Sequence, residues 1–218
     1  MIGIGNTVVR AIYGIGALLT FTSAPLLAQS YDPRSPGLQL HIQAGFNWST
    51  LTDVSPSAPE LAYEARRSAA FALRATYVLG PTPIAGFLEV GPAQRGARLQ
   101  QVGQPADIIR SRWYDLGGGL NLALRCVAGV CPSVEAGATL GYHRETLRVS
   151  GSTGNPVEVI PTNRWETAAL GGVRLASQRF RGIAVTVRRV EGLSQLPTDA
   201  STARNRSTLL LFSLPLGQ

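Results

Sequence analysis

Few side chains in this 218-residue chain could carry out chemistry: it has two histidines, two cysteines and twenty basic residues. A hydrolytic site needs a hydroxyl nucleophile activated by a base such as histidine. His143 stands beside Arg144 and Glu145, whereas His41 lies far away along the chain. The sequence contains no G-x-S-x-G, no H-E-x-x-H and no phosphate-binding loop. We therefore predict no catalytic residue, no metal site and no cofactor.

The two cysteines bracket a possible hairpin turn. Cys126 and Cys131 enclose the residues VAGV between two strand-like segments. No histidine or further cysteine stands near them, and a C-x-x-C redox pair is absent. We expect a structural disulfide, which the loop-entropy estimate values at about 2 kcal/mol.

These residues must be positioned by strands, because apolar and polar side chains alternate along the chain. Leu38, Leu40 and Ile42 alternate with Gln39 and His41, which is the period of a strand with one apolar face. We predict eight such strands, over residues 38–48, 69–79, 84–91, 112–125, 133–144, 164–176, 182–190 and 207–214. Residues 209–212 are contiguously apolar, so the last strand's facing stays open. A bulge is expected near Gly171-Gly172.

The first residues resemble a cleavable secretory signal. Residues 1–28 contain Arg10, an apolar stretch over 11–21 and the small residue Ala28. We assign 1–28 to the signal, 29–37 to a short lead, 38–214 to the strand domain and 215–218 to a tail. No later segment is apolar enough for a spanning helix, so any membrane crossing must use strands. Export also favours disulfide formation.

The connections between the predicted strands alternate between long and short. This rhythm is typical of an up-and-down bacterial outer-membrane barrel with short periplasmic turns and long outer loops. Charged residues make up only 15% of the chain, as expected if lipid covers the outer faces. An eight-stranded antiparallel β-barrel has an interior that side chains fill. The charges expected inside are Arg74, Glu89, Asp115, Arg125, Glu135, Glu166, Arg174 and Arg188.

Two alternatives stay open. A soluble periplasmic, lipocalin-like barrel that binds an apolar ligand would turn the aliphatic faces inward and the polar faces outward. A lipid-modifying outer-membrane enzyme would need its base near the outer end of a strand, where His143 is predicted to lie. Neither alternative is our main prediction, which is a non-enzymatic membrane barrel with a structural or interaction role through its outer loops.

The basic residues, all arginine, cluster in or beside the predicted long connections. Guanidinium groups bind phosphates through paired hydrogen bonds, so we expect contact with outer-membrane lipid head groups, possible lipopolysaccharide included, at Arg66, Arg67, Arg144 and Arg148. The net charge of +7 alone is a nonspecific signal, and without a recognised motif it does not indicate nucleic acid. We expect a monomer, with any protein partner at the outer loops.

Four strand segments carry a resemblance to a known group. LHIQAGFNWSTL, FLEVGPAQRGAR, CPSVEAGATLGY and ARNRSTLLLFSLPL are similar to the recurring strand patterns of PorT-like small outer-membrane β-barrel proteins. The resemblance covers nearly all of the chain after residue 28 and implies a β-barrel in the bacterial outer membrane. The chain departs from the pattern by ending in Pro215-Leu216-Gly217-Gln218 instead of a terminal aromatic residue.

Overall fold

The computed structural model describes residues 36–52, 61–80, 82–101, 103–158, 164–193, 196–198 and 201–216. The predicted signal, residues 1–28, lies outside the described residues, as does nearly all of the lead. Within the described part of the chain, no helix has the length and apolar character needed to cross a membrane.

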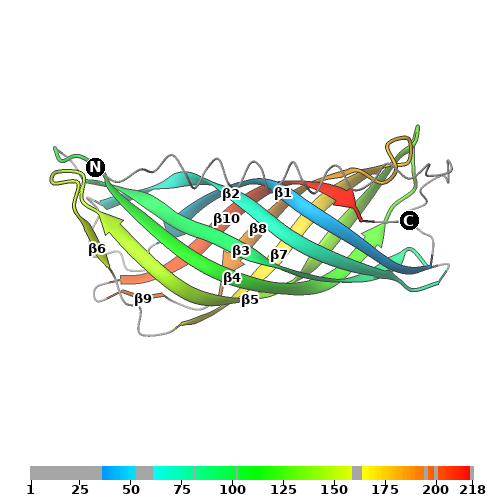
Figure 1. The fold of residues 1–218 in the computed structure, drawn as a ribbon, viewed down its shortest axis with the longest axis horizontal. Helices are drawn as coiled ribbons and strands as arrows, with labels where there is room; N and C mark the ends of the chain where they lie inside the picture. Colours follow the sequence, from blue (N-terminus) through cyan, green and yellow to red (C-terminus); the bar gives the residue numbers. More distant parts are fainter. Residues whose placement is uncertain are drawn as a thin grey trace. The chain divides into compact units, whose positions relative to one another are not determined.

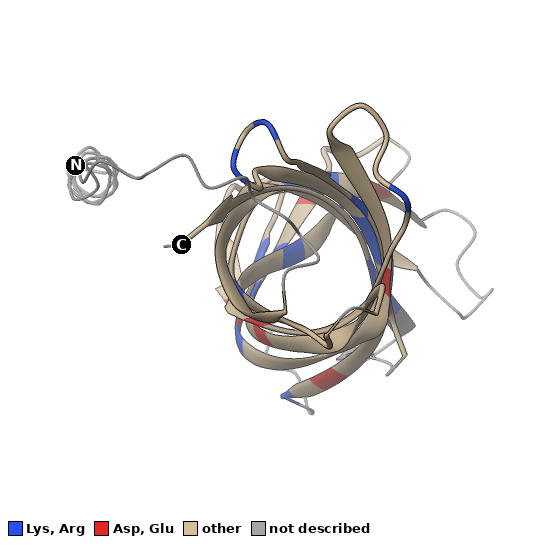
Figure 2. Ribbon diagram, turned by 90° about the vertical axis from the view of Figure 1, so that its right-hand side faces the viewer, with Lys and Arg blue, Asp and Glu red and all other residues tan. Residues whose placement is uncertain are grey.

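Eight long antiparallel strands form a closed ring (Figures 1 and 2). In ring order they are β1 (Gly37–Thr52), β2 (Leu61–Val78), β3 (Ile84–Gln101), β4 (Asp107–Ala123), β5 (Val130–Val149), β7 (Trp165–Ser177), β8 (Ala184–Gly192) and β10 (Ser201–Pro215). Pairing of β1 with β10 closes the ring. Two short strands add to its outer end, β6 (Pro156–Glu158) beside β5 and β9 (Leu196–Thr198) beside β10. The predicted all-β, eight-stranded antiparallel barrel is confirmed.

The alternation of side chains has placed the aliphatic residues outside. Leu38 is 65% exposed and Leu88 is 64% exposed, while the inward-facing His41 and Gln43 are at most 1% exposed. A lipocalin-like barrel needs the opposite arrangement, with an apolar cavity. The interior of this barrel is polar, so that alternative orientation is wrong.

The strands extend further toward the outer end than the sequence pattern predicts. β3 continues to Gln101 instead of ending near Gly91, and only residues 102–106 separate it from β4. Arg95 and Arg98, which fall in the connection between the predicted strands 84–91 and 112–125, therefore lie within a strand. Backbone hydrogen bonds continue the ladder there, but beyond the apolar belt both faces can carry polar residues. The alternation that marks a strand is consequently lost.

The register irregularities also differ from the prediction. Gly171 and Gly172 pair in continuous register with both neighbouring strands. The register instead shifts in the β2–β3 pair between Ala65 and Leu73 of β2, and in the β4–β5 pair, where Arg144 of β5 is the extra residue between the pairs Arg112–Glu145 and Trp113–His143. Both shifts lie in the outer halves of the strands, where the sequence pattern is weakest.

A tight disulfide-bonded turn joins β4 to β5. Val127 and Val130 exchange two backbone hydrogen bonds of 2.9 and 3.0 Å. The two residues between them have positive φ, 51° at Ala128 and 82° at Gly129, which is the type I′ geometry that suits hairpins. Cys126 and Cys131 lie next to this bonded pair and form the predicted disulfide. The turn thus brings the two cysteines face to face.

Candidate functional site: a sealed charged interior and an outer collar

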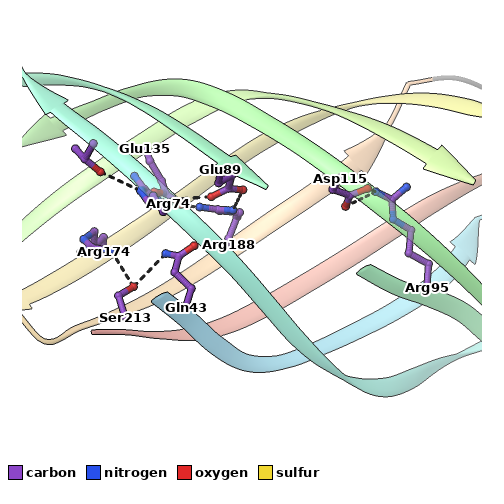
Figure 3. A network of polar contacts seen from close by, with 10 residues as sticks. Gln43, Arg74, Glu89, Arg95, Asp115, Glu135, Arg174, Arg188 and Ser213 are labelled. Atoms are coloured by element: carbon purple, nitrogen blue, oxygen red, sulfur yellow. Dashed lines mark hydrogen bonds and ion pairs between the residues drawn. The ribbon is translucent and has the colours of Figure 1, made fainter. Parts of the chain in front are cut away.

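Four charged residues form a network across the middle of the barrel, which we call the central network: Arg74, Glu89, Glu135 and Arg188 (Figure 3). Glu135 accepts hydrogen bonds from Arg74 Nη1 and from Arg188 Nε, each at 2.7 Å. Glu89 accepts a hydrogen bond from Arg188 and lies 4.0 Å from Arg74. The side chains of Arg74 and Glu135 have no exposed surface. These buried ion pairs connect side chains from four strands across the lumen.

A second group, the outer network, lies nearer the outer end and consists of Arg95, Asp115, Glu166 and Asn205. Arg95 Nη2 donates to both carboxylate oxygens of Asp115, at 2.7 and 2.6 Å, and its Nη1 donates to Glu166. Asn205 Nδ2 donates to Glu166 at 2.8 Å. Sequence reasoning missed Arg95 as an interior residue. It shares the parity of Glu89, so extending the alternation of β3 could have found it.

Each interior carboxylate lies against a glycine of another strand. Pairing places Glu89 opposite Gly117, Asp115 opposite Gly141 and Glu135 opposite Gly172. A Cβ added at each of these glycines would lie close to the carboxylate side chain: 2.8 Å for Gly117 and Glu89, 2.9 Å for Gly141 and Asp115, and 3.2 Å for Gly172 and Glu135. At Gly192, an added Cβ would lie 2.5 Å from Glu166. The glycines therefore leave the space that the carboxylates occupy inside a narrow barrel.

Seven of the eight predicted interior charges line the lumen, in the residues that the structure describes: Arg74, Glu89, Asp115, Glu135, Glu166, Arg174 and Arg188. Arg174 Nη1 donates to Ser213 Oγ at 2.9 Å. The prediction for Arg125 is wrong, since this residue is exposed in the turn after β4. β4 ends at Ala123, and parity no longer determines a facing once the chain has left the ladder.

The two histidines lie in different parts of the interior. His143 is 4% exposed, and its Nε2 lies 2.6 Å from Thr146 Oγ1, which in turn lies 2.7 Å from Ser111 Oγ. The ring packs edge-on to Trp113, with centroids 4.9 Å apart. The hydrogen bonds of the described residues connect this ring to a hydroxyl and to no carboxylate, so a Ser-His-acid arrangement is not formed. Among the described residues, no cluster of three or more metal-ligating side chains occurs.

Aromatic side chains mark the outer edge of the apolar surface. Tyr114, Tyr142 and Trp165 pair across β4, β5 and β7 and so form one row. Arg144 Nη1 donates to Tyr114 Oη at 2.7 Å, and Arg164 Nη1 donates to Tyr142 Oη at 3.3 Å.

A similar contact lies on β1 and β2, where the Arg67 guanidinium carbon is 4.0 Å from the centre of the Phe46 ring. We call these residues the arginine–aromatic collar: Arg67, Arg144 and Arg164 with Phe46, Tyr114, Tyr142 and Trp165.

The four arginines predicted to contact lipid differ in their surroundings. Arg67 and Arg144 are exposed and belong to the collar. Arg148 is exposed as well, but its Nε and Nη2 donate to Asp107 Oδ2 at 2.8 and 2.6 Å. Arg66 is half-buried and pairs opposite the buried Ser49. Arg164 joins the collar in their place, and its contact depends on strand register that the sequence does not display.

The fold and the side chains on the outer surface of the barrel together define a class of protein. On β4 and the residue after it, exposed apolar side chains run from Tyr114 to Leu124. At about 3.3 Å per residue and a tilt of about 40°, this stretch spans roughly 25 Å along the axis, the height of the apolar band of outer-membrane barrels. A closed antiparallel ring with apolar side chains outside and charges inside is the architecture of a small outer-membrane β-barrel.

In sequence, the chain matches no protein-family model and no curated protein. In fold, it is similar to Ail, the attachment invasion locus protein of Yersinia pestis, with 14% identity, a TM-score of 0.46 and coverage of 83% of this chain and 99% of that one. It is also similar to Neisserial surface protein A, with 11% identity, a TM-score of 0.47 and coverage of 82% and 98%. For the outer membrane protein OprG of Pseudomonas aeruginosa, the identity is 7%, the TM-score 0.49 and the coverage 83% and 94%. At these identities nothing that those proteins bind or do is carried over to this chain.

Proposed function

We propose that this protein is a sealed, non-enzymatic barrel of a Gram-negative-type outer membrane, which binds lipopolysaccharide phosphates at its collar and presents its outer loops to a partner. One observation carries the membrane assignment: aliphatic side chains cover the outside, while charged groups such as Glu135 are buried at the centre. A barrel surrounded by lipid hydrocarbon is expected to have both features, apolar side chains outside and charged groups inside. Membership of the PorT-like group belongs to the same proposal and is supported by the four strand segments that resemble it.

The collar supports contact with lipid phosphates. A guanidinium held against an aromatic ring keeps its planar N–H edge available, and that edge matches the geometry of a phosphate. Arg67 is held by Phe46, and Arg144 is held by the phenol oxygen of Tyr114. The collar lies where apolar surface gives way to polar surface, which is the level of the lipid head groups. A row of preformed guanidinium groups at that level suits anionic lipid A phosphates.

The interior supports a structural or interaction role instead of a channel. The central network crosses the lumen from β2 and β3 to β5 and β8. Opening a water-filled path would break buried ion pairs, each of which is strongly destabilising to break. We expect no stepwise conductance when the protein is inserted in a planar bilayer.

Retention of lipopolysaccharide tests the collar. Arg67→Gln, Arg144→Gln and Arg164→Gln combined should lower the lipopolysaccharide bound after detergent purification by at least about tenfold, since even one charge-assisted hydrogen bond to phosphate contributes about 1.5–3 kcal/mol. The control triple variant removes the same charge from exposed arginines that hold carboxylates instead: Arg112→Gln, Arg189→Gln and Arg206→Gln. Native mass spectrometry counts the bound lipid. Equal losses in the two triple variants would show that only net charge matters and would refute the collar.

Cell fractionation tests the location. The protein should pellet with outer membranes, require detergent for extraction and migrate differently on gels before and after heating. Release with the periplasmic contents, in soluble form, would contradict the membrane assignment whatever the lipopolysaccharide result.

A further inference from the structure

The short-turn end of the barrel is basic. The three turns at this end, residues 79–83, 124–129 and 178–183, contain three arginines and neither aspartate nor glutamate. Figure 2 looks onto this end and shows basic segments on the two turns that project from the ring. The first carboxylates further along β3 and β5, Glu89 and Glu135, point into the lumen and belong to the central network. In these turns, no carboxylate therefore offsets the positive charge.

Two of the three arginines can bind an external group. Arg125 and Arg179 are exposed, and within the described part of the chain neither forms an ion pair or a hydrogen bond. The third, Arg181, already interacts with other atoms of the protein. An exposed arginine of the outer end differs from the first two, since Arg189 donates to Glu191. The guanidinium groups of Arg125 and Arg179 are thus the ones that an acceptor outside the protein can reach.

The two turns that carry these arginines are in contact. The Gln178 amide donates to the Gly129 carbonyl oxygen at 2.9 Å. A Cβ added at Gly129 would lie 3.5 Å from Arg179 Cγ, so the stem of Arg179 lies over the tip of the turn that carries Arg125. We call the exposed side chains of these two turns the basic turn surface: Arg125, Val127, Arg179 and Phe180.

The basic turn surface follows directly after the apolar outer surface of the barrel. Leu124 is 43% exposed at the end of this apolar surface, and Val127 comes three residues later. At about 3.3 Å per residue and a tilt of about 40°, three residues correspond to roughly 8 Å along the axis. The head-group layer of one leaflet is roughly 5–8 Å thick. At the outer end, in contrast, β4 continues from Tyr114 to Asp107, roughly 18 Å beyond the apolar surface. The short turns therefore lie at the level of the lipid head groups.

Apolar side chains accompany the arginines in these turns. Phe180 and Val127 are each 68% exposed. At a membrane interface such side chains reach the edge of the hydrocarbon, while a neighbouring arginine reaches the phosphates. A guanidinium binds a phosphate through paired hydrogen bonds. An anionic lipid fits better than a zwitterionic one, because the arginines repel a head group that ends in an ammonium.

We propose that the basic turn surface binds anionic phospholipid head groups, such as phosphatidylglycerol, in the inner leaflet of the outer membrane. Arg125 and Arg179 donate to the phosphate oxygens, and Phe180 packs against the upper part of an acyl chain. This lipid differs in leaflet and in head group from the lipopolysaccharide proposed at the collar. The inference rests on the membrane assignment of the proposed function and is independent of what the collar binds.

Photo-labelling of the folded protein tests this contact. The protein is refolded in a neutral detergent and titrated with phosphatidylglycerol or with phosphatidylcholine, each carrying a diazirine on its head group, and peptide mass spectrometry locates the adducts. Phosphatidylglycerol should label residues 124–130 and 177–183 along a saturating curve, at a concentration about tenfold lower than phosphatidylcholine requires. Equal labelling by the two lipids would overturn the proposal, and this comparison needs no variant to fold.

Two double variants locate the effect. Arg125→Gln with Arg179→Gln should raise the half-saturating concentration of phosphatidylglycerol at these turns by at least about tenfold, since two charged donors are lost. The matched control, Arg112→Gln with Arg189→Gln, removes the same charge from the exposed outer end and should leave labelling of the turns unchanged. If both double variants weaken the labelling equally, net charge alone attracts the lipid and the proposal is wrong.

Cell fractionation separates this inference from the proposed function. A protein that is recovered in outer membranes, but whose short turns phosphatidylglycerol does not label, refutes the basic turn surface and leaves the membrane assignment intact. Recovery as a soluble periplasmic protein refutes both.

Discussion

Replacing Gly117 by alanine tests whether the interior glycines exist to make room for the carboxylates. The added Cβ would lie 2.8 Å from Glu89 Cγ and 2.9 Å from its Oε1, and all three nearest atoms belong to that side chain. Because Cγ lies close to the backbone, Glu89 can avoid the contact only by rotating away from Arg188, with which it is hydrogen-bonded. Overpacking costs about 1–3 kcal/mol, and loss of a buried ion pair sets an upper limit of about 3–5 kcal/mol. We expect Gly117→Ala to lower the free energy of unfolding by about 2 kcal/mol.

Gly86→Ala is the matched control on the neighbouring strand. A Cβ there would have no atom within 4 Å, and its backbone has no positive φ. The substitution should change stability by no more than about 0.5 kcal/mol, or raise it slightly because alanine loses less entropy in a strand. Unfolding by urea in phospholipid vesicles, followed through the fluorescence of the three tryptophans, measures both variants.

A double-mutant cycle with Glu89→Ala isolates the contact. Without the glutamate side chain, Gly117→Ala should have almost no effect, and the coupling energy should be about 2 kcal/mol. The reasoning is refuted if Gly117→Ala costs the same in both backgrounds, since its effect would then come from the backbone and not from Glu89.

Three further predictions follow from the interior, the outer rim and the turn. Glu135→Gln keeps the side-chain shape but removes the charge that two buried arginines share, so it should destabilise by about 3–5 kcal/mol in urea. The exposed Glu191→Gln should cost less than about 1 kcal/mol, and equal effects would contradict the central network. At the rim, hydrogen bonds from the Gly151 amide and from Arg148 hold the pKa of Asp107 below its ordinary value. A carboxyl group whose pKa is lowered by folding stabilises the folded state at pH values above its unfolded pKa of about 3.9. This stabilisation is lost as the pH falls through the pKa of the folded state. Protection of the Gly151 amide from hydrogen exchange should therefore be constant from about pH 7 to 5 and decline below about pH 4. The variant Asp107→Asn should abolish this decline. A decline that persists in Asp107→Asn would exclude Asp107 as its source. Replacing both cysteines by serine should lower the free energy of unfolding by about 2 kcal/mol. Reductant should leave the urea midpoint of this double variant unchanged. If the double variant had the same midpoint as the oxidised unsubstituted protein, the disulfide would not stabilise the fold.

Much of the fold could be predicted because residues two apart in one strand point their side chains to the same side of the sheet. Leu38 to Phe46 alternate with His41 and Gln43 in the sequence, and the structure exposes and buries them in that order. The outer halves of the strands could not be predicted in this way. Arg98 lies beyond the apolar belt, where water replaces lipid and the alternation of apolar and polar residues stops while the backbone ladder continues. Arg125 follows the last residue of β4 at the short-turn end, where the alternation also no longer applies. For this reason it was wrongly predicted to point into the barrel.

The sequence by itself determined that this chain forms strands, which side chains point inward on most of them, and that Cys126 and Cys131 flank a hairpin. Tertiary structure alone decided which inward charges meet. Arg74 and Glu135 are far apart in the chain and come within 2.7 Å only because β1 closes on β10 and fixes the curvature of the ring. Cross-strand register likewise decided that a glycine faces each of Glu89, Asp115 and Glu135. The physical reason is that alternation is a local property of one strand, whereas pairing register and ring closure are properties of all eight strands together.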